Sequence, residues 1–384
     1  MKKIALSLLA FAAALSLSAQ GMKLPEGFIP AKLDKTYAEA QGSYTPDFSI
    51  DGKNCKVKNV ILLIGDGLGL GATASAYFAN GGELTMTNLR TMGYSVTQSS
   101  DDFTTDSAAS GTAYATGHKT KNGALGMDPE GNRLQNIPEL LTPLGYACGV
   151  VSTDEITGAT PAAFFAHQNS RHSAIPIWED LGKSPLVFAS AGSIPGFEKL
   201  DLQLQEKLKK QFTVVYSPED NAVKGSDRLA YFPPSVSEGR GDYLPKTTQM
   251  AIDYLSQRGK KGFFLMVEGA RIDKYAHGNN LEGTVKETLD FDKAVEAALR
   301  FAEKDGHTLV IISADHETGA IVARKGNYEE NYVQSSFASP QHSPMMVPLY
   351  AYGPQSGAFM GYQQNNEVAL KIIEIFTKGK VSGR

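Results

Sequence analysis

Residues 59–67 read Asn-Val-Ile-Leu-Leu-Ile-Gly-Asp-Gly, a short apolar run that stops at the carboxylate of Asp66. Two later runs have the same form: 262–267 precedes Glu268, and 308–313 precedes Asp315 and His316. Short apolar runs bounded by glycine predict fully buried parallel strands. In an open α/β sheet, ligands bind beyond the carboxyl ends of such strands. Acidic and imidazole groups gathered there are costly without a cation, so the pattern predicts a metal site at that end of the sheet.

Outside these runs, predicted strands alternate with predicted helices. Further strands are expected at 92–98, 148–153 and 346–352, and helices at 72–79, 106–116, 135–144, 160–170, 246–258, 283–303 and 367–377. This alternation predicts an α/β fold, a three-layer sandwich whose mostly parallel central sheet is flanked by helices.

Two segments depart from the alternation. Residues 20–56 show no sustained period and are expected to form an N-terminal arm. From about 173 to 245, prolines, glycines and a charged helix interrupt the pattern. We expect an insertion or cap over the strand ends there, or surface decoration without a function.

The composition and the N-terminus restrict the class of protein. The 384 residues are 42% hydrophobic and 20% charged with a net charge of −4, which excludes wholesale disorder and gives no sign of a nucleic-acid partner. Lys2 and Lys3 precede the apolar run 4–15 and a small-residue region, 16–20. This order predicts a signal peptide over 1–19, and the run is too short to span a bilayer. We therefore expect an exported protein, periplasmic or secreted.

The two cysteines of the exported chain leave two alternatives open. Cys55 and Cys148 can form a disulfide in an oxidising compartment, or Cys148 can be a free thiol in a buried strand. No Cys-x-x-Cys pair is present, which excludes a thiolate zinc site.

Seven side chains are candidate metal ligands: Asp66, Glu268, Asp273, His277, Asp315, His316 and His342. Asp273 and His277 are four residues apart, so they share one face of a helix. Each residue taken alone is more typical of a helix cap or a satisfied polar group. Zinc normally takes four ligands, so this larger set suits two close metals, as in two-metal phosphoryl-transfer sites.

A candidate nucleophile lies in the segment 104–113, which has almost no bulky side chains. Ser107 is expected at the start of a helix, where backbone N–H groups and the helix dipole favour an anion. A serine hydroxyl needs a base or a metal, and the absence of a Gly-x-Ser-x-Gly elbow argues against a hydrolase triad. Alternatively, Asp106 and Ser107 serve only as a helix N-cap. Arg171 is a candidate clamp for two phosphate oxygens.

At this point the motifs resemble those of the alkaline phosphatases. The nucleophile signature of that family is similar to 106–113, Asp-Ser-Ala-Ala-Ser-Gly-Thr-Ala, continuing through 116–120 and 122–126. Other motifs of the family resemble 64–67, 159–163, 267–274, 314–316, 341–342, 347–348 and 351–354. The resemblance covers roughly residues 57–175 and 245–375, and it implies a catalytic domain over 57–384.

The resemblance implies hydrolysis of small phosphate monoesters with broad specificity, through a phosphoserine on Ser107. Arg171 would bind the phosphoryl oxygens, and Lys274 would be a supporting charge near the phosphate. It implies two zinc ions and a third metal, usually magnesium. The implied ligands are Asp273, His277 and His342 for the first zinc, Asp66, Asp315 and His316 for the second, and Asp66, Thr160 and Glu268 for the third metal.

One position departs from the family pattern. Two residues before Thr160, where well-known members carry Asp or His, this chain has Gly158, which offers no side-chain donor. The family suggests a homodimer, while the divergent segment 173–245 is equally consistent with a monomer.

The motifs favour a monoesterase over three rival functions. Sulfatases mature a Cys or Ser in a Cys/Ser-x-Pro-x-Arg context, and the residues after Ser107 include neither Pro nor Arg at those places. Phosphodiesterases of this fold generally lack the third-metal carboxylate, so Glu268 together with Thr160 favours a monoesterase. A phospho-ligand binder without turnover is disfavoured by the presence of Ser107, Arg171 and the full ligand set.

Overall fold

The computed structural model describes residues 32–192, 194–237 and 239–381. The signal peptide predicted over 1–19 and the first part of the predicted arm lie outside these residues. No helix in the described part of the chain has the length and apolar character needed to cross a membrane.

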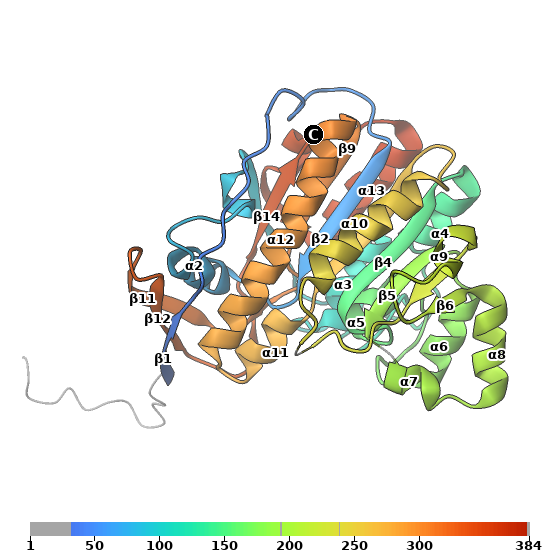
Figure 1. Ribbon diagram of the computed structural model, residues 1–384, viewed down its shortest axis with the longest axis horizontal. Coiled ribbons are helices and arrows are strands. Elements are labelled where there is room, and N and C mark those ends of the chain that lie inside the picture. The colour runs from blue at the N-terminus through green and yellow to red at the C-terminus, as the bar shows by residue number, and fades with distance from the viewer. Residues whose placement is uncertain (1–31, 193, 238, 382–384) are drawn as a thin grey trace, which may run out of the picture. The chain divides into compact units, whose positions relative to one another are not determined.

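The described residues are built on one ten-stranded sheet (Figure 1). Its strands are β2 (Asn59–Gly65), β3 (Thr91–Val96), β4 (Ala147–Glu155), β5 (Phe188–Gly192), β6 (Thr213–Val215), β7 (Leu229–Tyr231), β8 (Phe263–Gly269), β9 (Thr308–Ser313), β14 (Val347–Tyr352) and β15 (Gly361–Gln364). The order across the sheet is β15-β3-β14-β9-β2-β8-β4-β5-β7-β6. Strand β14 runs antiparallel to both β3 and β9, and every other neighbouring pair is parallel. The predicted α/β fold with a mostly parallel sheet is confirmed.

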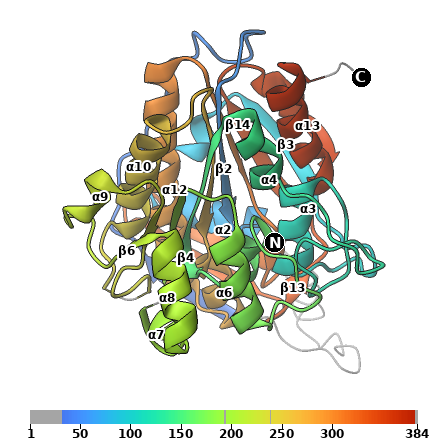
Figure 2. The ribbon, with the colours of Figure 1, turned by 90° about the vertical axis from the view of Figure 1, so that its right-hand side faces the viewer.

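Helices cover both faces of the sheet (Figure 2). The helices are α2 (Leu70–Ala79), α3 (Ser107–Thr116), α4 (Ile137–Leu141), α5 (Ala159–Ala163), α6 (Ala174–Lys183), α7 (Ile194–Glu198), α8 (Leu202–Gln211), α9 (Ala222–Gly225), α10 (Tyr243–Ser256), α11 (Arg271–His277), α12 (Leu281–Asp305) and α13 (Asn365–Lys378). Short 3-10 turns lie at Met86–Asn88, Thr142–Leu144 and Ser356–Phe359.

The alternation of side chains along the buried strand β2 produces two hydrophobic cores. Val60, Leu62 and Ile64 belong to the core formed with α3, α5 and α13. Ile61 and Leu63 belong to the other core, formed with α2, α10 and α12. The three layers follow from this, because a strand that is apolar on both faces needs a helical layer on each side.

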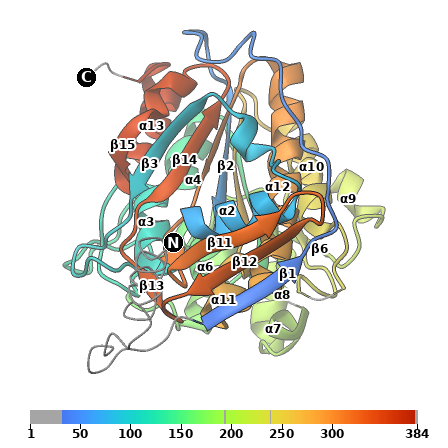
Figure 3. The same cartoon turned by 90° about the vertical axis from the view of Figure 1, so that its left-hand side faces the viewer.

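A second, smaller sheet contains part of the predicted N-terminal arm (Figure 3). Strands β1 (Lys32–Tyr37), β11 (Ile321–Asn327) and β12 (Tyr332–Phe337) form an antiparallel sheet in the order β1-β12-β11. Residues 32–37 of the predicted arm are therefore a strand of this sheet. Their partner strand lies about 300 residues further along the chain, so no local period could indicate the pairing.

The segment 173–245 contributes strands to the central sheet. It contains α6 to α9, and its strands β5, β7 and β6 continue the central sheet in parallel beyond β4. These strands have three to five residues and contain several small side chains, so they are too short to give a clear strand pattern.

The helix predicted over 160–170 is shorter in the structure. It ends at Ala163, because Phe164 and Phe165 turn into the core and Gln168 pairs with Leu125 instead.

The two cysteines do not form a disulfide in the structure. Cys55 and Cys148 are both free thiols.

Candidate metal centre

Three neighbouring strands deliver acidic groups to one end of the sheet. Strand β2 lies between β9 and β8, with Ile64 opposite both Ser313 and Glu268. Asp66 and Asp315 each follow within two residues of these positions. The side chains are buried, with exposed fractions of 6% for Asp66, 1% for Glu268 and 0% for Asp315. Buried carboxylates this close together need a compensating charge.

The first cluster consists of Asp66, Asp315 and His316, each of which places one ligand atom within 4.8 Å of the others. The His316 Nε2 atom lies 3.4 Å from Asp66 Oδ1 and 3.3 Å from Asp315 Oδ2. Neither carboxylate oxygen has a hydrogen-bond partner within the described residues. Buried polar atoms are rarely left in this state, so the donor set fits a bound cation.

The second cluster joins α11 to β13 (His342–Ser343), a two-residue strand paired with β10 (Glu317–Thr318). Asp273 and His277 share a face of α11, with 3.3 Å between Asp273 Oδ2 and His277 Nε2. The His342 Nε2 atom lies 3.5 Å from Asp273 Oδ1 and 3.1 Å from His277 Nε2. Three donor atoms therefore converge, as a zinc site requires.

Backbone carbonyls fix the orientation of the two imidazoles in this cluster. The Nδ1 atom of His277 lies 2.6 Å from the Pro340 carbonyl oxygen, and that of His342 lies 2.9 Å from the Thr105 carbonyl oxygen. Each ring thus directs Nε2 inward, in the arrangement typical of metal-binding histidines. The rings of His342 and His316 stack with centroids 3.5 Å apart, which joins the second cluster to the first.

Burial and mutual repulsion control the pKa values of the first cluster. Burial, together with the charge of Asp315, raises the pKa of Asp66 well above its usual value. Burial raises the pKa of Asp315 to about 6, and burial with the charge of His342 lowers the pKa of His316 to about 3. A neutral imidazole is the form that binds metals.

In the second cluster, hydrogen bonds outweigh burial. Burial alone would raise the pKa of Asp273, but hydrogen bonds from His277 and His342 hold it well below its usual value. The reciprocal hydrogen bond raises the pKa of His277 to about 9.

The candidate nucleophile Ser107 begins α3, as expected. Asp106 is the N-cap, because its Oδ1 atom accepts the N–H of Ala109 at 2.9 Å. The cap function therefore belongs to Asp106, and the buried Ser107 hydroxyl is directed elsewhere: its Oγ atom lies 3.2 Å from His316 Nε2. The serine lies at the edge of the first cluster.

The candidate anion clamp is fixed beside the serine. A guanidinium N–H of Arg171 donates to Asp106 Oδ2 at 3.1 Å, and the Arg171 side chain is 30% exposed. Asn122 was missed by sequence reasoning, and its Oδ1 atom accepts the N–H of Asp106 at 2.9 Å. These residues line an open pocket of about 390 Å³, together with Thr104, Thr105, Ser107, Asp273, His277, Gln341 and His342.

The remaining predicted residues lie around Glu268. The Glu268 carboxylate accepts a hydrogen bond from Ser152, and burial together with the charge of Asp154 raises its pKa to about 8. The buried Thr160 hydroxyl lies beside Glu268 and has no hydrogen-bond partner among the described residues. Lys274 forms an ion pair with Asp154. Sequence reasoning missed Asp154, although it too lies at the carboxyl end of a buried strand.

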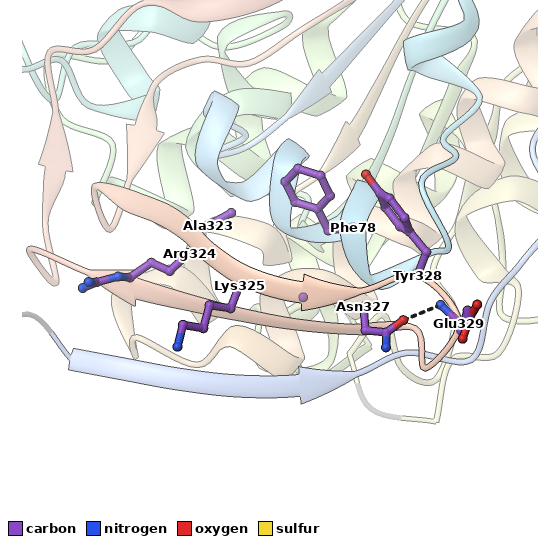
Figure 4. Close-up of a pocket in the computed structure, with 8 residues that line it drawn as sticks. Phe78, Ala323, Arg324, Lys325, Asn327, Tyr328 and Glu329 are labelled. Carbon is purple, nitrogen blue, oxygen red and sulfur yellow. Dashed lines mark hydrogen bonds between the residues drawn. The ribbon is translucent and has the colours of Figure 1, made fainter.

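A larger hollow, of about 700 Å³, lies away from these residues (Figure 4). Its lining comes from Phe78 of α2 and from 323–329 in the β11–β12 hairpin. It shares no residue with either cluster, so its larger volume does not mark it as the catalytic site.

A comparison with protein-family models matches the chain to "Alkaline phosphatase" over residues 57–180 and 238–335. The chain belongs to the alkaline phosphatase family. Alkaline phosphatase 4 of Bacillus subtilis is 36% identical over 312 residues, 75% of this chain and 67% of that protein. The alkaline phosphatase of Escherichia coli is 31% identical over 405 residues, 81% of this chain and 84% of that protein.

Solved structures agree with this family. The alkaline phosphatase of the Antarctic bacterium TAB5 is 34% identical, with a TM-score of 0.77, and the match covers 84% of this chain and 98% of that one. Alkaline phosphatases are metal-dependent phosphatase hydrolases that act on phosphate esters, and this chain is one of them by sequence and by fold. The family model leaves out residues 181–237, within the segment expected to diverge.

The pKa values predict how stability depends on pH in the metal-free protein. Glu268 and His277 are protonated in the folded chain up to about pH 8 and about pH 9, but are mostly deprotonated at pH 7 and above when unfolded. Raising the pH from 7 to 9 therefore removes stabilising protons from the folded state only. We expect the melting temperature of chelated protein to fall over this range, as differential scanning fluorimetry would measure.

Two comparisons make this prediction specific. Protein loaded with metals should show a smaller fall, because its ligands are deprotonated at both pH values. Chelated Glu268→Gln should also show a smaller fall than the chelated wild type. An equal fall in the two chelated proteins would contradict the prediction.

Proposed function

We propose that the protein hydrolyses phosphate monoesters through a phosphoserine on Ser107, with broad specificity for the alcohol. The observation that carries the proposal is the position of the Ser107 hydroxyl, 3.2 Å from His316 Nε2 and beside two carboxylate oxygens without partners. Arg171 opens onto the same pocket. These are the parts that phosphoryl transfer requires: a nucleophile, a place for cations and an anion clamp.

The ligand sets proposed for the cations follow the clusters. Asp273, His277 and His342 would hold one zinc ion, and Asp66, Asp315 and His316 would hold the second. Asp66, Thr160 and Glu268 would hold magnesium, a proposal supported by a histidine-to-aspartate variant of the TAB5 enzyme with Mg bound in its M3 site. When bound, the cations supply Lewis acidity toward the phosphoryl, attacking and leaving oxygens.

The residues of this chain would then act in two steps. Ser107 Oγ gives up its proton to solvent and attacks phosphorus, the P–O bond to the alcohol breaks, and the leaving oxygen takes up a proton from solvent as the alcohol departs through the open pocket. Water next attacks the phosphoserine, the bond from phosphorus to Oγ breaks, and inorganic phosphate is released. Arg171, fixed by Asp106, holds phosphoryl oxygens in both steps. Since the pocket is open, little selects for the alcohol.

The test is hydrolysis of p-nitrophenyl phosphate by purified protein with zinc and magnesium at alkaline pH. Hydrolysis of bis-p-nitrophenyl phosphate at a comparable rate would favour a phosphodiesterase instead. Phosphate binding without any turnover would favour a phospho-ligand binder. Export to the periplasm or medium and assembly as a homodimer remain predictions, which cell fractionation and sedimentation would test.

Replacing Arg171 by alanine should lower kcat/KM for p-nitrophenyl phosphate by roughly 10²-fold, because a charged donor to the phosphoryl oxygens is lost. Inhibition by inorganic phosphate should weaken as well. Arg300→Ala is a matched control, since Arg300 is an exposed arginine that also pairs with a carboxylate, Glu296. Equal losses in the two variants would mean that Arg171 does not bind the substrate.

A further inference from the structure

The third cation position has one unpartnered donor but lacks one side chain. The Thr160 hydroxyl is buried and has no hydrogen-bond partner among the described residues. Gly158 directly precedes α5 and offers no side chain to the same region. The unpartnered hydroxyl indicates a ligand there, and a further ligand must come from another residue.

The space next to Gly158 is taken by a carboxylate from a different position. A Cβ atom added to Gly158 would lie 2.7 Å from Asp154 Oδ2 and 3.1 Å from Asp154 Cγ. The backbone of Gly158 has φ −54° and ψ 148°, which any residue adopts, so backbone conformation does not require glycine. The room for a side chain at 158 is instead filled by Asp154.

Strand β4 places Asp154 on the same face as Ser152, whose hydroxyl bonds to Glu268. Ser152 and Asp154 are two residues apart on β4, and Ser152 lies opposite Glu268 in the sheet. The Ser152 hydroxyl donates to Glu268 and accepts the Asp154 N–H at 2.8 Å. Pairing of β4 with β5 is irregular between Val151 and Glu155, and such irregularities redirect side chains at functional sites.

The charges around Asp154 are incompletely balanced. The Ser152 hydroxyl contacts both Glu268 and the backbone of Asp154, so two like-charged carboxylates lie in one region and repel each other. Lys274 pairs with Asp154, but the lysine side chain is 41% exposed, where an ion pair contributes little. A divalent cation between the carboxylates would relieve this repulsion more completely.

We propose that Asp154 supplies the carboxylate of the third cation position, in place of the side chain that Gly158 lacks. The inference rests on the proposed function, from which it takes the other three ligands. With Asp154 included, every donor of the set is an oxygen atom. Oxygen donors suit Mg²⁺, which also retains several of its waters, whereas zinc favours nitrogen and sulfur ligands.

The experiment is calorimetric titration of Mg²⁺ into protein already loaded with zinc. We expect Asp154→Asn to weaken Mg²⁺ binding by about 10-fold or more, while metal analysis still finds two zinc ions per chain. Glu155→Gln is the matched control, because Glu155 is exposed and follows Asp154 on the same strand. Its Mg²⁺ affinity should equal that of the wild type.

A second variant tests whether Asp154 is a cation ligand or only the ion-pair partner of Lys274. If Asp154 binds the cation, Lys274→Ala removes a competitor and should bind Mg²⁺ at least as tightly as the wild type. If Asp154 only positions the lysine, Asp154→Asn leaves the Mg²⁺ affinity unchanged, and that result would overturn the inference. The rise in melting temperature on adding Mg²⁺ provides a second readout, and it also shows whether each variant is folded.

The outcomes also distinguish this inference from the proposed function. If the wild-type enzyme is active but Asp154→Asn binds Mg²⁺ as tightly as the wild type, the inference is wrong and the proposed function stands. A wild-type protein that binds Mg²⁺ through Asp154 but does not hydrolyse p-nitrophenyl phosphate overturns the proposed function alone.

Discussion

Ser107→Ala should lower kcat for p-nitrophenyl phosphate by roughly 10³-fold or more, the largest effect that we expect from a single substitution. The alanine variant has no oxygen to accept the phosphoryl group, so only direct attack by water on the bound ester remains. Arg171 and the cation ligands are unchanged, so phosphate inhibition and zinc content should stay close to those of the wild type. Rapid-quench detection of labelled phosphoenzyme would show whether the covalent step is lost.

Ser110 offers a control on the same helix. The Ser110 hydroxyl donates to the Asp315 carbonyl oxygen at 2.6 Å and accepts a hydrogen bond from Asn365, so its role is structural. Ser110→Ala should cost about 1 kcal/mol of stability while retaining labelled phosphoenzyme. If Ser107→Ala turned over as fast as the wild type, the serine would not be the nucleophile.

Asp315→Asn should produce two effects of opposite sign. Loss of the carboxylate should remove the serine-side zinc and lower kcat by roughly 10³-fold. In chelated protein at pH 8, the same substitution should raise the free energy of unfolding by about 1–3 kcal/mol. The reason is that Asp315 Oδ2 is fully buried without a partner among the described residues, and a neutral amide removes that buried charge.

Urea unfolding of the wild type and the variant, each with and without metals, would measure both effects. The amide can keep the oxygen that accepts the N–H groups of Gly67 and His316. With zinc bound, the wild type should be the more stable of the two. A chelated variant that is less stable than the chelated wild type would show that the carboxylate stabilises the fold by itself.

The sequence was sufficient to predict the central strands, because their signal is local. Strands β2, β8 and β9 are continuous apolar runs in which the buried positions leave no ambiguity. Strands β5, β6 and β7 have no such runs. They are stabilised by pairing at the edge of the central sheet, next to β4. Propensity could not locate them, because their stabilisation comes from pairing with strands distant in sequence.

The candidate site was predicted because its carboxylates have a clear local signal. Asp154 was missed because it has none. Asp66, Glu268 and Asp315 stand out because each carboxylate interrupts an apolar run. Asp154 follows the polar residues Ser152 and Thr153, so the end of β4 resembles the start of an ordinary loop. Only the register of β4 beside β8 shows that Asp154 lies two residues beyond the partner of Glu268, Ser152.

The second cluster has a consequence for a chain that is still being synthesised. Asp273 and His277 are neighbours on one helical turn, whereas His342 comes 65 residues after His277 and reaches them through the two-residue ladder of β10 and β13. A nascent chain therefore has only two of the three proposed ligands until His342 has been made. A metal ion held by all three, as proposed above, would tie these distant segments together as a cross-link does, and its uptake would come late in folding.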